Sequence, residues 1–460
     1  MISTQTTALL DDKKSKIETR LFINGEFVES SDKKKFSIHS PATHELVAEA
    51  EDDTNRAVAA AKRSQPAWAK LSPEERGVPM MKLAALLRGD GEQLAFESFA
   101  GAGYTAKGVS SLNTPGFVNM SLRQPYGVVA AIIPWNVPLV AFSGKVAPAL
   151  IAGNTVVLKS SEKAPLTSLR LAELAIIAGF PPGVLNVLSG HGPVAGGVLS
   201  SHMDVRAISF TGSTRTGRLI QTAAAQSNLK NVILELGGKS PAVVFEDADL
   251  ESAVPMVAHS IQWNSGQVCM ANSRVHVQDT IADRFLELFT HNFGAVRQGS
   301  PLESTTNHGP LADNAQFEMV SNYIASGKES GHLPLGGGAK DGFVEPTVFT
   351  ETPEDARIMV EEVFGPVVNS TIFHTEEEAL TKANNTEFGL YAAVFTTNIN
   401  RAMRFAKGLE AGTVGVNCTS PVTAHDLSFG GWKSSGVGLE GLLDSINAFL
   451  ETKSVLVKIE

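Results

Sequence analysis

The chain has only two cysteines among its 460 residues, Cys269 and Cys418. Two thiols cannot form a disulfide framework, and their scarcity is typical of a reducing compartment, with the cytosol as the default location. An excess of positive charge is also lacking, because the formal net charge is −10. This charge argues against nucleic acids and anionic membrane surfaces as partners.

An uninterrupted hydrophobic run of membrane-spanning length is missing as well. The most apolar stretch, residues 127–158, is interrupted by prolines, asparagines and one lysine, so it predicts buried strands and a helix rather than a membrane span. The first 20 residues contain acidic side chains and no apolar core, so they fit neither a secretory signal nor a transit peptide. We expect a frayed tail there.

Metal-binding histidine pairs and internal repeats are absent too. The eleven histidines form no H-x-x-x-H or H-x-x-E-H pair, so we expect no metal site. The composition, with 43% hydrophobic and 19% charged residues, is that of an ordinary globular protein. A chain of this length exceeds the size of a single core, and we expect two or three domains.

From residue 127 to residue 236, apolar runs typical of β-strands alternate with helical patterns. The predicted strands are residues 127–133, 155–158, 184–188, 205–210 and 232–236, and the predicted helices are residues 139–152, 166–178, 194–199 and 218–225. This order predicts a parallel sheet with helices on both faces. Before it, residues 21–28 indicate a hairpin around Asn24-Gly25, and residues 52–94 are largely helical.

A second alternating stretch begins near Pro241. Its predicted strands are residues 274–277, 344–348, 367–373 and 413–417, and its predicted helices include residues 281–289 and 376–384. The pattern predicts a second α/β domain. A β-rich run at residues 454–459 follows after the chain has left that domain, so we expect this strand to pair elsewhere, for example across a subunit interface.

The turn at residues 211–217, TGSTRTG, joins a predicted strand to a predicted helix and could hold a phosphate group. Backbone N–H groups at such a helix start can bind a pyrophosphate. The turn lacks both the Walker Lys-Ser/Thr pair and the spacing of the G-x-G-x-x-G fingerprint. From these residues alone, cofactor binding and a plain strand–helix turn are equally good interpretations.

Three side chains are candidates for a catalytic role, and each also has a purely structural interpretation. Cys269 comes shortly after Gly266, which lets a ligand approach closely, but a free cysteine is usually a small buried hydrophobe. Glu235 precedes two glycines at a predicted strand end and could equally be a surface carboxylate. Cys418 lies in a polar loop and is interpreted as a structural thiol.

Seven segments together resemble the aldehyde dehydrogenase superfamily in order and spacing. They are residues 133–136 (IPWN), 153–162 (GNTVVLKSSE), 210–214 (FTGST), 235–239 (ELGGK), 266–269 (GQVC), 362–366 (EVFGP) and 429–431 (FGG). The resemblance covers nearly the whole chain from Leu21 onward. It implies an NAD(P)-dependent enzyme of the hydrolytic type, in which a thiol attacks an aldehyde and the resulting hemithioacetal gives a hydride to nicotinamide.

The resemblance assigns the catalytic roles to three residues. Cys269 matches the nucleophile, whose thiolate is accessible from an unperturbed pKa of about 8.5. The oxyanion formed by its attack would be held by the Asn136 side-chain amide and the Cys269 backbone N–H. Glu235 matches the general base that activates water for release of the acid, and its presence argues against a CoA-acylating relative.

The resemblance also implies an NAD(P) site. Lys159 and Glu162 match the residues that hold the adenosine ribose, and Ser213 matches a pyrophosphate ligand. Glu362 and Phe364 match the clamp on the nicotinamide ribose. Further matching positions are Trp135, Ser161, Gly212 and Gly217. A carboxylate at Glu162 would bond to a 2′-hydroxyl and repel a 2′-phosphate, which favours NAD, although Lys159 could tolerate NADP.

The chain departs from the family pattern near the expected substrate entrance. After Ser98 a helical stretch is shortened by about thirty residues, or roughly 45 Å of helix, which should expose apolar surface or widen the substrate tunnel. Small residues stand where relatives have bulky tunnel residues, and two more predicted pocket residues flank the nucleophile. These five positions are Val137, Ala141, Gly144, Val268 and Met270. The loop of residues 419–428 is expected at the tunnel mouth.

The sequence therefore predicts an α/β protein in three parts. These are a doubly wound, parallel-sheet cofactor domain (residues 1–106 and 124–237), an α/β catalytic domain (residues 238–447) and a small β oligomerisation element (residues 107–123 and 448–460). We expect a cytoplasmic homodimer or homotetramer that oxidises a bulky or aromatic aldehyde with NAD, NADP being possible. Two alternatives stay open: a non-catalytic scaffold, because of the shortened segment after Ser98, and an enzyme that hydrolyses activated esters without a cofactor.

Overall fold

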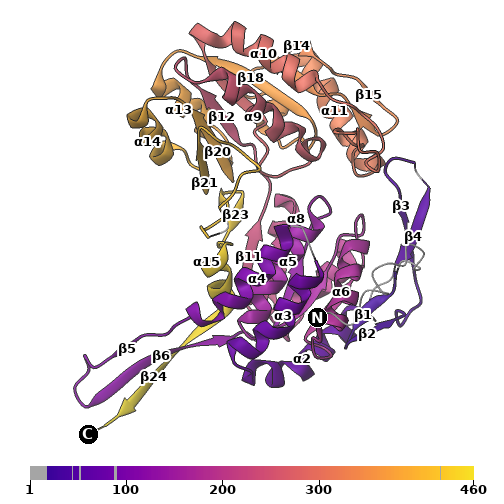
Figure 1. The fold of residues 1–460 in the computed structure, drawn as a ribbon, viewed down its shortest axis with the longest axis vertical. Helices are drawn as coiled ribbons and strands as arrows, with labels where there is room; N and C mark the ends of the chain where they lie inside the picture. Colours follow the sequence, from indigo (N-terminus) through magenta and orange to yellow (C-terminus); the bar gives the residue numbers. More distant parts are fainter. Residues whose placement is uncertain (1–17, 44, 51–52, 88–90, 425, 460) are drawn as a thin grey trace.

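The computed structural model describes residues 18–43, 45–50, 53–87, 91–424 and 426–459. Most of the tail expected over residues 1–20 lies outside the described residues, as does position 425 of the predicted mouth loop. Figure 1 shows two lobes, each built around its own sheet, and an arm that projects away from the lower lobe. We call the lobe that contains β1 the first lobe and the lobe that contains β12 the second lobe.

The first lobe contains an eight-stranded sheet with the order β2-β1-β9-β8-β7-β10-β11-β23. Its strands are β1 (Leu21–Ile23), β2 (Glu26–Val28), β7 (Val128–Ile132), β8 (Thr155–Lys159), β9 (Leu185–Leu188), β10 (Val205–Thr211), β11 (Asn231–Glu235) and β23 (Gly436–Val437). Neighbours from β9 to β11 pair in parallel, and β1 and β2 form the predicted hairpin. Strand β23 comes from far downstream and joins the edge antiparallel to β11.

Helices cover both faces of this sheet. They are α2 (Thr54–Lys70), α3 (Pro73–Leu86), α4 (Gly91–Ala102), α5 (Pro138–Ile151), α6 (Leu166–Ala178), α7 (Gly197–Ser201) and α8 (Thr214–Gln226). Phe142 of α5 and Leu169 of α6 belong to the core on one face, whereas Val58 of α2 and Ile220 of α8 belong to the core on the other. The doubly wound sheet expected from the alternating pattern is confirmed.

Helix α4 occupies the place where the sequence is shortened. It continues without a break through Ser98, and both of its phenylalanines are buried, Phe96 completely and Phe99 to 7% exposure. The Phe96 ring lies 6.4 Å from the Phe142 ring of α5. Burial of these aromatic rings stabilises the short connection, because each removes a large apolar surface from water.

The second lobe contains a seven-stranded sheet with the order β14-β17-β18-β13-β12-β20-β21, parallel except for β14. Its strands are β12 (Pro241–Val244), β13 (Arg274–Gln278), β14 (His332–Leu335), β17 (Thr347–Thr350), β18 (Val367–Phe373), β20 (Tyr391–Phe395) and β21 (Thr413–Val416). Its helices are α9 (Leu250–Gln262), α10 (Ala282–Gly294), α11 (Asn314–Ser330), α12 (Arg357–Val360), α13 (Glu376–Asn384) and α14 (Ile399–Gly408). Side chains of α9 and α10 pack on one face, and side chains of α13 and α14 pack on the other.

Two predicted elements differ from the structure. The strand predicted over residues 344–348 is split into β16 (Phe343–Val344) and β17, because Pro346 between them has no N–H group to donate to a neighbouring strand. The helix predicted over residues 194–199 is a π-helical turn (Gly192–Gly196) followed by α7.

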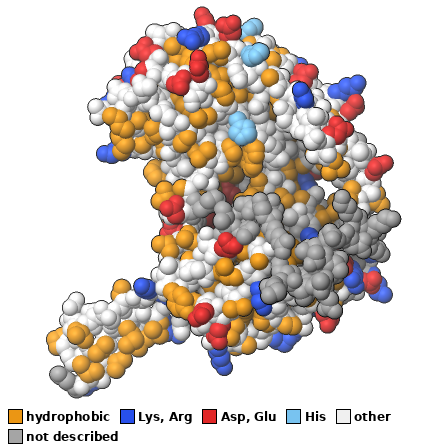
Figure 2. Space-filling model, in the orientation of Figure 1, with side chains coloured by type: hydrophobic (Ala, Val, Ile, Leu, Met, Phe, Trp, Pro, Cys, Tyr) orange, Lys and Arg blue, Asp and Glu red, His pale blue; other side chains and the backbone are white. Residues whose placement is uncertain are grey.

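The projecting arm is a three-stranded sheet with the order β24-β6-β5. Strand β24 (Leu450–Lys458) pairs antiparallel with β6 (Phe117–Pro125) along its full length, and β5 (Ser110–Ser111) lies on the other side of β6. The late strand therefore pairs with β6 of its own chain along one edge, and its other edge has no partner strand among the described residues. Helix α15 (Leu442–Ala448) leads into it. Figure 2 shows hydrophobic side chains gathered on the surface of this arm.

The remaining elements are short. Three two-stranded pairs are β3 (Phe36–His39) with β4 (Leu46–Ala50), β15 (Ala339–Lys340) with β16, and β19 (Phe388–Gly389) with β22 (Trp432–Lys433). The 3-10 turns are Gly103–Thr105, Trp263–Gly266 and Asp279–Ile281. Among the described residues, no helix combines the length and the apolar character needed to cross a bilayer.

Candidate active site

Residues predicted to bind the cofactor lie at the carboxyl ends of central strands of the first sheet. Strands β8, β7 and β10 are parallel neighbours, so their carboxyl ends lie side by side. Trp135 follows β7, Lys159 ends β8 and Ser213 follows β10. From β7 and β10 the chain winds to opposite sides of the sheet, and doubly wound sheets bind ligands beside such a switch point.

The second lobe turns the amino ends of its strands toward these carboxyl ends. Gly238, Cys269 and Glu362 precede β12, β13 and β18, which are adjacent and parallel. The rings of Trp135 in the first lobe and Phe364 in the second meet edge-on, with their centroids 5.4 Å apart. The predicted catalytic and cofactor-binding residues therefore come together between the two lobes, and we call this region the interlobe site.

The loop before Cys269 has a backbone conformation that requires support. Asn264, Ser265 and Gly266 have φ angles of 52°, 54° and 75°. Left-handed conformations cost energy in residues other than glycine and persist where the surroundings fix them. A Cβ atom on Gly266 would lie 2.2 Å from the Gly365 carbonyl carbon, so only glycine lets these two segments touch.

The Asn136 side chain is oriented by this same loop. Its Nδ2 donates to the Gln267 backbone carbonyl at 2.9 Å, and the backbone carbonyl of Asn136 accepts from Asn264 Nδ2 at 3.0 Å. The Gln267 side chain is fixed in turn, because it accepts the Ala312 N–H at 2.9 Å. An amide group has two N–H donors, so this hydrogen bond leaves the second donor of Asn136 available to another acceptor.

The Cys269 thiol and the Glu235 carboxyl lie side by side. Burial, the charge of Glu235 and a hydrogen bond to that carboxyl raise the pKa of the Cys269 thiol. Burial also raises the pKa of Glu235 to about 7, with the charge of Glu440 adding to the shift and the Lys145 ammonium opposing it. Glu235 Oε1 is buried and has no hydrogen-bond partner among the described residues. A carboxyl of this kind can exchange protons at neutral pH.

Two charged residues that the sequence analysis did not identify lie near Glu235. Lys145 of α5 is 1% exposed, and its Nζ donates to Ser209 Oγ at 2.9 Å and to Glu440 Oε1 at 2.5 Å. A buried lysine requires a partner, so the single lysine in residues 127–158 was a usable signal. Its partner is 295 residues away and carried no signal of its own.

An ion pair stands at the carboxyl end of β8. Lys159 Nζ lies 3.0 Å from Glu162 Oε2, and although burial acts in the opposite direction, the Lys159 charge holds the pKa of Glu162 below its usual value. Ser161 is buried, and its hydroxyl accepts the Lys163 N–H at 3.3 Å. A charged carboxylate in this position fits a ribose hydroxyl donor.

The turn after β10 leads into the N-terminus of α8. Ser213 caps the helix by accepting the Thr216 N–H at 3.3 Å, and Gly212 donates its N–H to the carbonyl of Glu235 at 3.1 Å. A Cβ atom on Gly217 would lie 2.7 Å from a side chain that follows β11, so glycine allows α8 to pack closely on the sheet. A helix start has a positive dipole end and backbone N–H groups that point away from the helix, and these features fit a pyrophosphate.

Glu362 and Phe364 are held at the opposite side of the interlobe site. The Gly238 N–H donates to Glu362 Oε1 at 2.8 Å, and burial raises the pKa of Glu362 to about 7 against this hydrogen bond. A Cβ atom on Gly237 would lie 2.3 Å from Glu362 Oε2. Phe364 has a φ of 58°, and its carbonyl accepts from Gln316 Nε2 at 2.8 Å. The sequence analysis missed Gln316.

The predicted pocket residues are divided between open and packed positions. Val137 precedes α5 and is half-buried, Ala141 is buried, and a Cβ atom on Gly144 would meet no atom within 4 Å. Val268 belongs to the hydrophobic core of the second lobe, and the half-buried Met270 packs against that core. The structure thus leaves space beside Gly144, whereas Val268 is part of a packed core.

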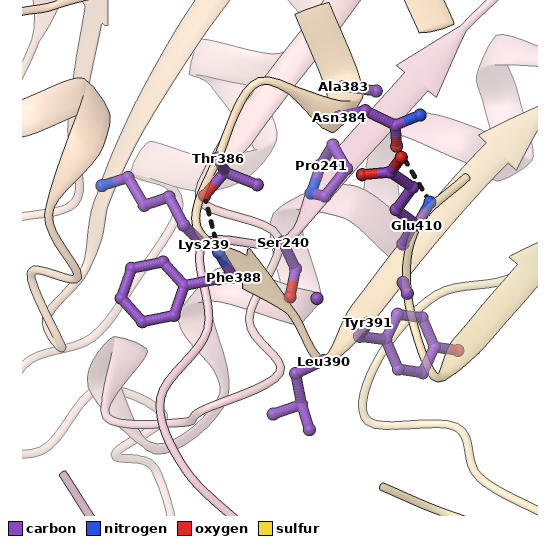
Figure 3. Close-up of a pocket in the computed structure, with 13 residues that line it drawn as sticks. Lys239, Ser240, Pro241, Ala383, Asn384, Thr386, Phe388, Leu390, Tyr391 and Glu410 are labelled. Atoms are coloured by element: carbon purple, nitrogen blue, oxygen red, sulfur yellow. Dashed lines mark hydrogen bonds between the residues drawn. The ribbon is translucent and has the colours of Figure 1, made fainter. Parts of the chain in front are cut away.

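A small cavity lies close to the interlobe site but outside it. Figure 3 shows Lys239, Ser240, Tyr391 and Glu410 around this cavity, and none of its lining residues was predicted as a site residue. Lys239 follows Gly238, but its ammonium donates to a backbone carbonyl of α12. Within the part of the chain that the structure describes, no group of three or more His, Cys, Asp or Glu side chains could hold a metal ion.

The chain matches the sequence profile of the aldehyde dehydrogenase family over residues 27–98 and 95–455. The two matched pieces meet at the segment that the sequence analysis identified as shortened.

Known proteins similar to this chain include an aldehyde dehydrogenase from Davidiella tassiana, 41% identical over 96% of this chain and 95% of that protein. Retinal dehydrogenase 2 from Homo sapiens is 40% identical over 96% of this chain and 92% of that protein. An indole-3-acetaldehyde dehydrogenase from P. syringae, solved with NAD+ and IAA, superimposes with a TM-score of 0.94 at 38% identity, covering 97% of this chain and 98% of that one. The chain therefore belongs to the aldehyde dehydrogenase family and is an NAD(P)-dependent oxidoreductase that acts on aldehydes.

Proposed function

We propose that the protein oxidises a bulky, apolar aldehyde to the carboxylic acid through a covalent intermediate on Cys269. The observation that carries the mechanism is the contact between the Cys269 thiol and the Glu235 carboxyl. The observation that carries the substrate class is the open space beside Gly144 of α5.

The reaction begins when the Cys269 thiol releases its proton to water. The thiolate then attacks the carbonyl carbon, which forms the S–C bond of a hemithioacetal. The carbonyl oxygen becomes an oxyanion. The Asn136 amide and the Cys269 backbone N–H donate to it, and fixed donors of this kind contribute about 2.7–4 kcal/mol each in comparable sites.

The hemithioacetal then loses hydride, and the thioester forms. When bound, the nicotinamide cofactor supplies the hydride acceptor. Glu362 and Phe364 would hold its ribose in position, and the hydrogen bond from Gln316 to the Phe364 carbonyl fixes that segment. At the other end, the start of α8 would hold the pyrophosphate and Glu162 would hold the adenosine ribose.

Release of the acid requires a water molecule. Glu235 accepts the proton of that water as its oxygen attacks the thioester carbonyl, the S–C bond breaks, and Cys269 leaves as the thiolate and regains a proton. A pKa of about 7 suits this carboxyl to accept the proton of the water and to return a proton to the Cys269 thiolate at neutral pH.

Preference for NAD over NADP follows from the charge at Glu162. Its pKa is held below the usual value by Lys159, so the carboxylate is charged at neutral pH and repels a 2′-phosphate. The Lys159 ammonium could bind the 2′-phosphate of NADP only after its ion pair with Glu162 is broken. NADP is therefore the weaker second cofactor.

A bulky substrate is supported by three features. Val137 and Ala141 are small, Gly144 has no neighbour within 4 Å of a Cβ position, and Val140 on the same helix is 53% exposed. Similar proteins include enzymes named for indole-3-acetaldehyde and for retinal. An apolar group that fills this space is stabilised by about 25 cal/mol per Å² of surface buried.

A homodimer or homotetramer is supported by the arm. Strand β24 is an edge strand of its sheet, and it carries exposed apolar side chains at Leu456 and Val457, with Leu122 exposed on neighbouring β6. Exposed edges and apolar patches of this kind favour association with a partner. A cytoplasmic location stays a prediction from the low cysteine content.

The direct test is NADH formation from NAD+ with a panel of aliphatic, aromatic and two-ring aldehydes. We expect oxidation of the larger apolar aldehydes with the highest kcat/KM. Absence of NADH formation with every aldehyde would favour the non-catalytic scaffold, and release of acid from an activated ester without NAD+ as the only activity would favour the esterase. Retention of Cys269, Glu235 and Asn136 at the interlobe site favours the dehydrogenase.

A further inference from the structure

Lys163 connects the two lobes beside the interlobe site. It lies in the first lobe, next to Glu162 in the segment between β8 and α6. Its Nζ is 2.7 Å from Asp313 Oδ2 of the second lobe and 5.4 Å from the centroid of the Trp135 ring. The two charged side chains are 28% and 36% exposed, so the pair is only partly screened by water.

Asp313 is itself tied to the predicted nicotinamide clamp. It caps the N-terminus of α11 by accepting the Gln316 N–H at 2.8 Å, and the Gln316 side chain donates to the Phe364 carbonyl. Phe364 packs edge-on against Trp135. The contacts therefore form a closed circuit from Lys163 through Asp313, α11 and Phe364 to Trp135 and back, and the circuit crosses between the lobes twice.

The segment before Asp313 also supports the catalytic loop. The Ala312 N–H donates to Gln267 Oε1 at 2.9 Å, and the Gly309 carbonyl accepts from Ser265 Oγ at 2.9 Å. Displacement of Asp313 would thus disturb the contacts both of the nicotinamide clamp and of the loop that carries Cys269.

We propose that Lys163 is a positioning residue that fastens the second lobe to the first across the bound nicotinamide cofactor and thereby sets how long the cofactor is retained. The inference rests on the cofactor placement proposed above. Lys163 acts through Asp313 and Trp135, and its amine need not touch the cofactor. A partly exposed ion pair of this kind should change cofactor affinity by about two- to fivefold.

Two variants remove the pair by different routes. K163M keeps the length of the side chain and removes its charge. D313N removes the opposite charge and keeps the helix cap, because asparagine caps helices as well as aspartate does. K62M is the matched control, since it breaks the 2.6 Å Lys62–Asp204 ion pair within the first lobe. K163R tests rescue by a conservative change.

NADH binding to each variant, without aldehyde, is measured by fluorescence titration and by stopped-flow release. We expect K163M and D313N each to raise the Kd about two- to fivefold through faster release, with the double variant no worse than either single variant. K62M should match the wild type, and K163R should restore most of the affinity. Rising salt should weaken binding by the wild type more than by K163M.

Unchanged Kd and release rate in both single variants would overturn the role of Lys163, and so would effects that add in the double variant. Failure of the wild type to bind NADH would overturn the cofactor placement itself, together with this inference. The two failures are therefore distinguishable, because only the second affects the unmodified protein.

Discussion

The Cys269 thiol and the Glu235 carboxyl are in contact, and each shifts the proton affinity of the other. The carboxylate charge raises the pKa of the thiol, and the hydrogen bond from the thiol lowers the pKa of the carboxyl, which burial nevertheless raises to about 7. The thiol is therefore protonated at rest and must lose its proton before it attacks the aldehyde. Glu235 is needed only afterwards, when water attacks the thioester, so the two residues should have separable kinetic signatures.

Replacing Cys269 by alanine should reduce aldehyde oxidation below about a hundredth of the wild-type rate, because the nucleophile is lost. NADH binding should be unchanged, since the predicted cofactor contacts come from other residues. Steady-state kinetics and fluorescence titration measure the two properties. C418A is the control and should retain activity. Loss of activity in C418A with retention in C269A would show that Cys418, not Cys269, is the nucleophile.

The E235Q variant should separate the two halves of the reaction. Glutamine cannot accept the proton of the attacking water, so deacylation should fall by about 10²–10⁴-fold. A rapid burst of NADH should survive, because removing the carboxylate charge also removes the repulsion that raises the pKa of Cys269. Stopped-flow absorbance records both phases. If burst and steady state vanish together, Glu235 is required for the first attack.

The E440Q variant should move the pH profile of deacylation to lower pH. Glu235 must be deprotonated to act, so the rate rises with pH through its pKa of about 7. The Glu440 charge raises that pKa, and its removal leaves the Lys145 ammonium to lower it further. Activity should therefore persist to more acidic pH than in the wild type. E173Q, which removes a carboxylate on α6 that pairs with Arg170, should leave the profile in place; a shift to higher pH in E440Q would contradict this account.

The G144W variant should discriminate between large and small substrates. The indole would occupy the open space beside α5, so kcat/KM for a two-ring aldehyde should fall roughly ten- to a hundredfold, while acetaldehyde should be little affected. Tryptophan is a better helix former than glycine, so the helix is preserved. G144A adds one methyl group to open space and should behave as the wild type. Unchanged kcat/KM for the two-ring aldehyde in G144W would place its binding site elsewhere.

Elements with strong local signals could be predicted from the sequence. The bounds predicted for α6 and α13 agree with the structure residue for residue, because α6 is terminated by Gly179, whose φ is 85°, and α13 begins after Thr375, which caps it. The parallel strands followed from their apolar runs. Pro346, which divides a predicted strand, acts through one missing hydrogen-bond donor that an apolar pattern does not reveal.

Contacts between distant segments could not be predicted in the same way. Each predicted cofactor residue matched a motif, but Lys145–Glu440 and Lys163–Asp313 join residues with no pattern in common. Gln316 likewise acquires its importance only where α11 meets the Phe364 segment. Pairs of this kind depend on the packing of the two lobes, which no local spacing encodes.

The covalent intermediate on Cys269 can be tested directly by mass spectrometry of E235Q. The variant is mixed with NAD+ and a two-ring aldehyde, quenched in acid after the burst, and digested. The account predicts an adduct on the peptide that contains Cys269, with the mass of the aldehyde less two hydrogens and only when NAD+ is present. A burst of NADH with an unmodified Cys269 peptide, or with the adduct on Cys418, would contradict it.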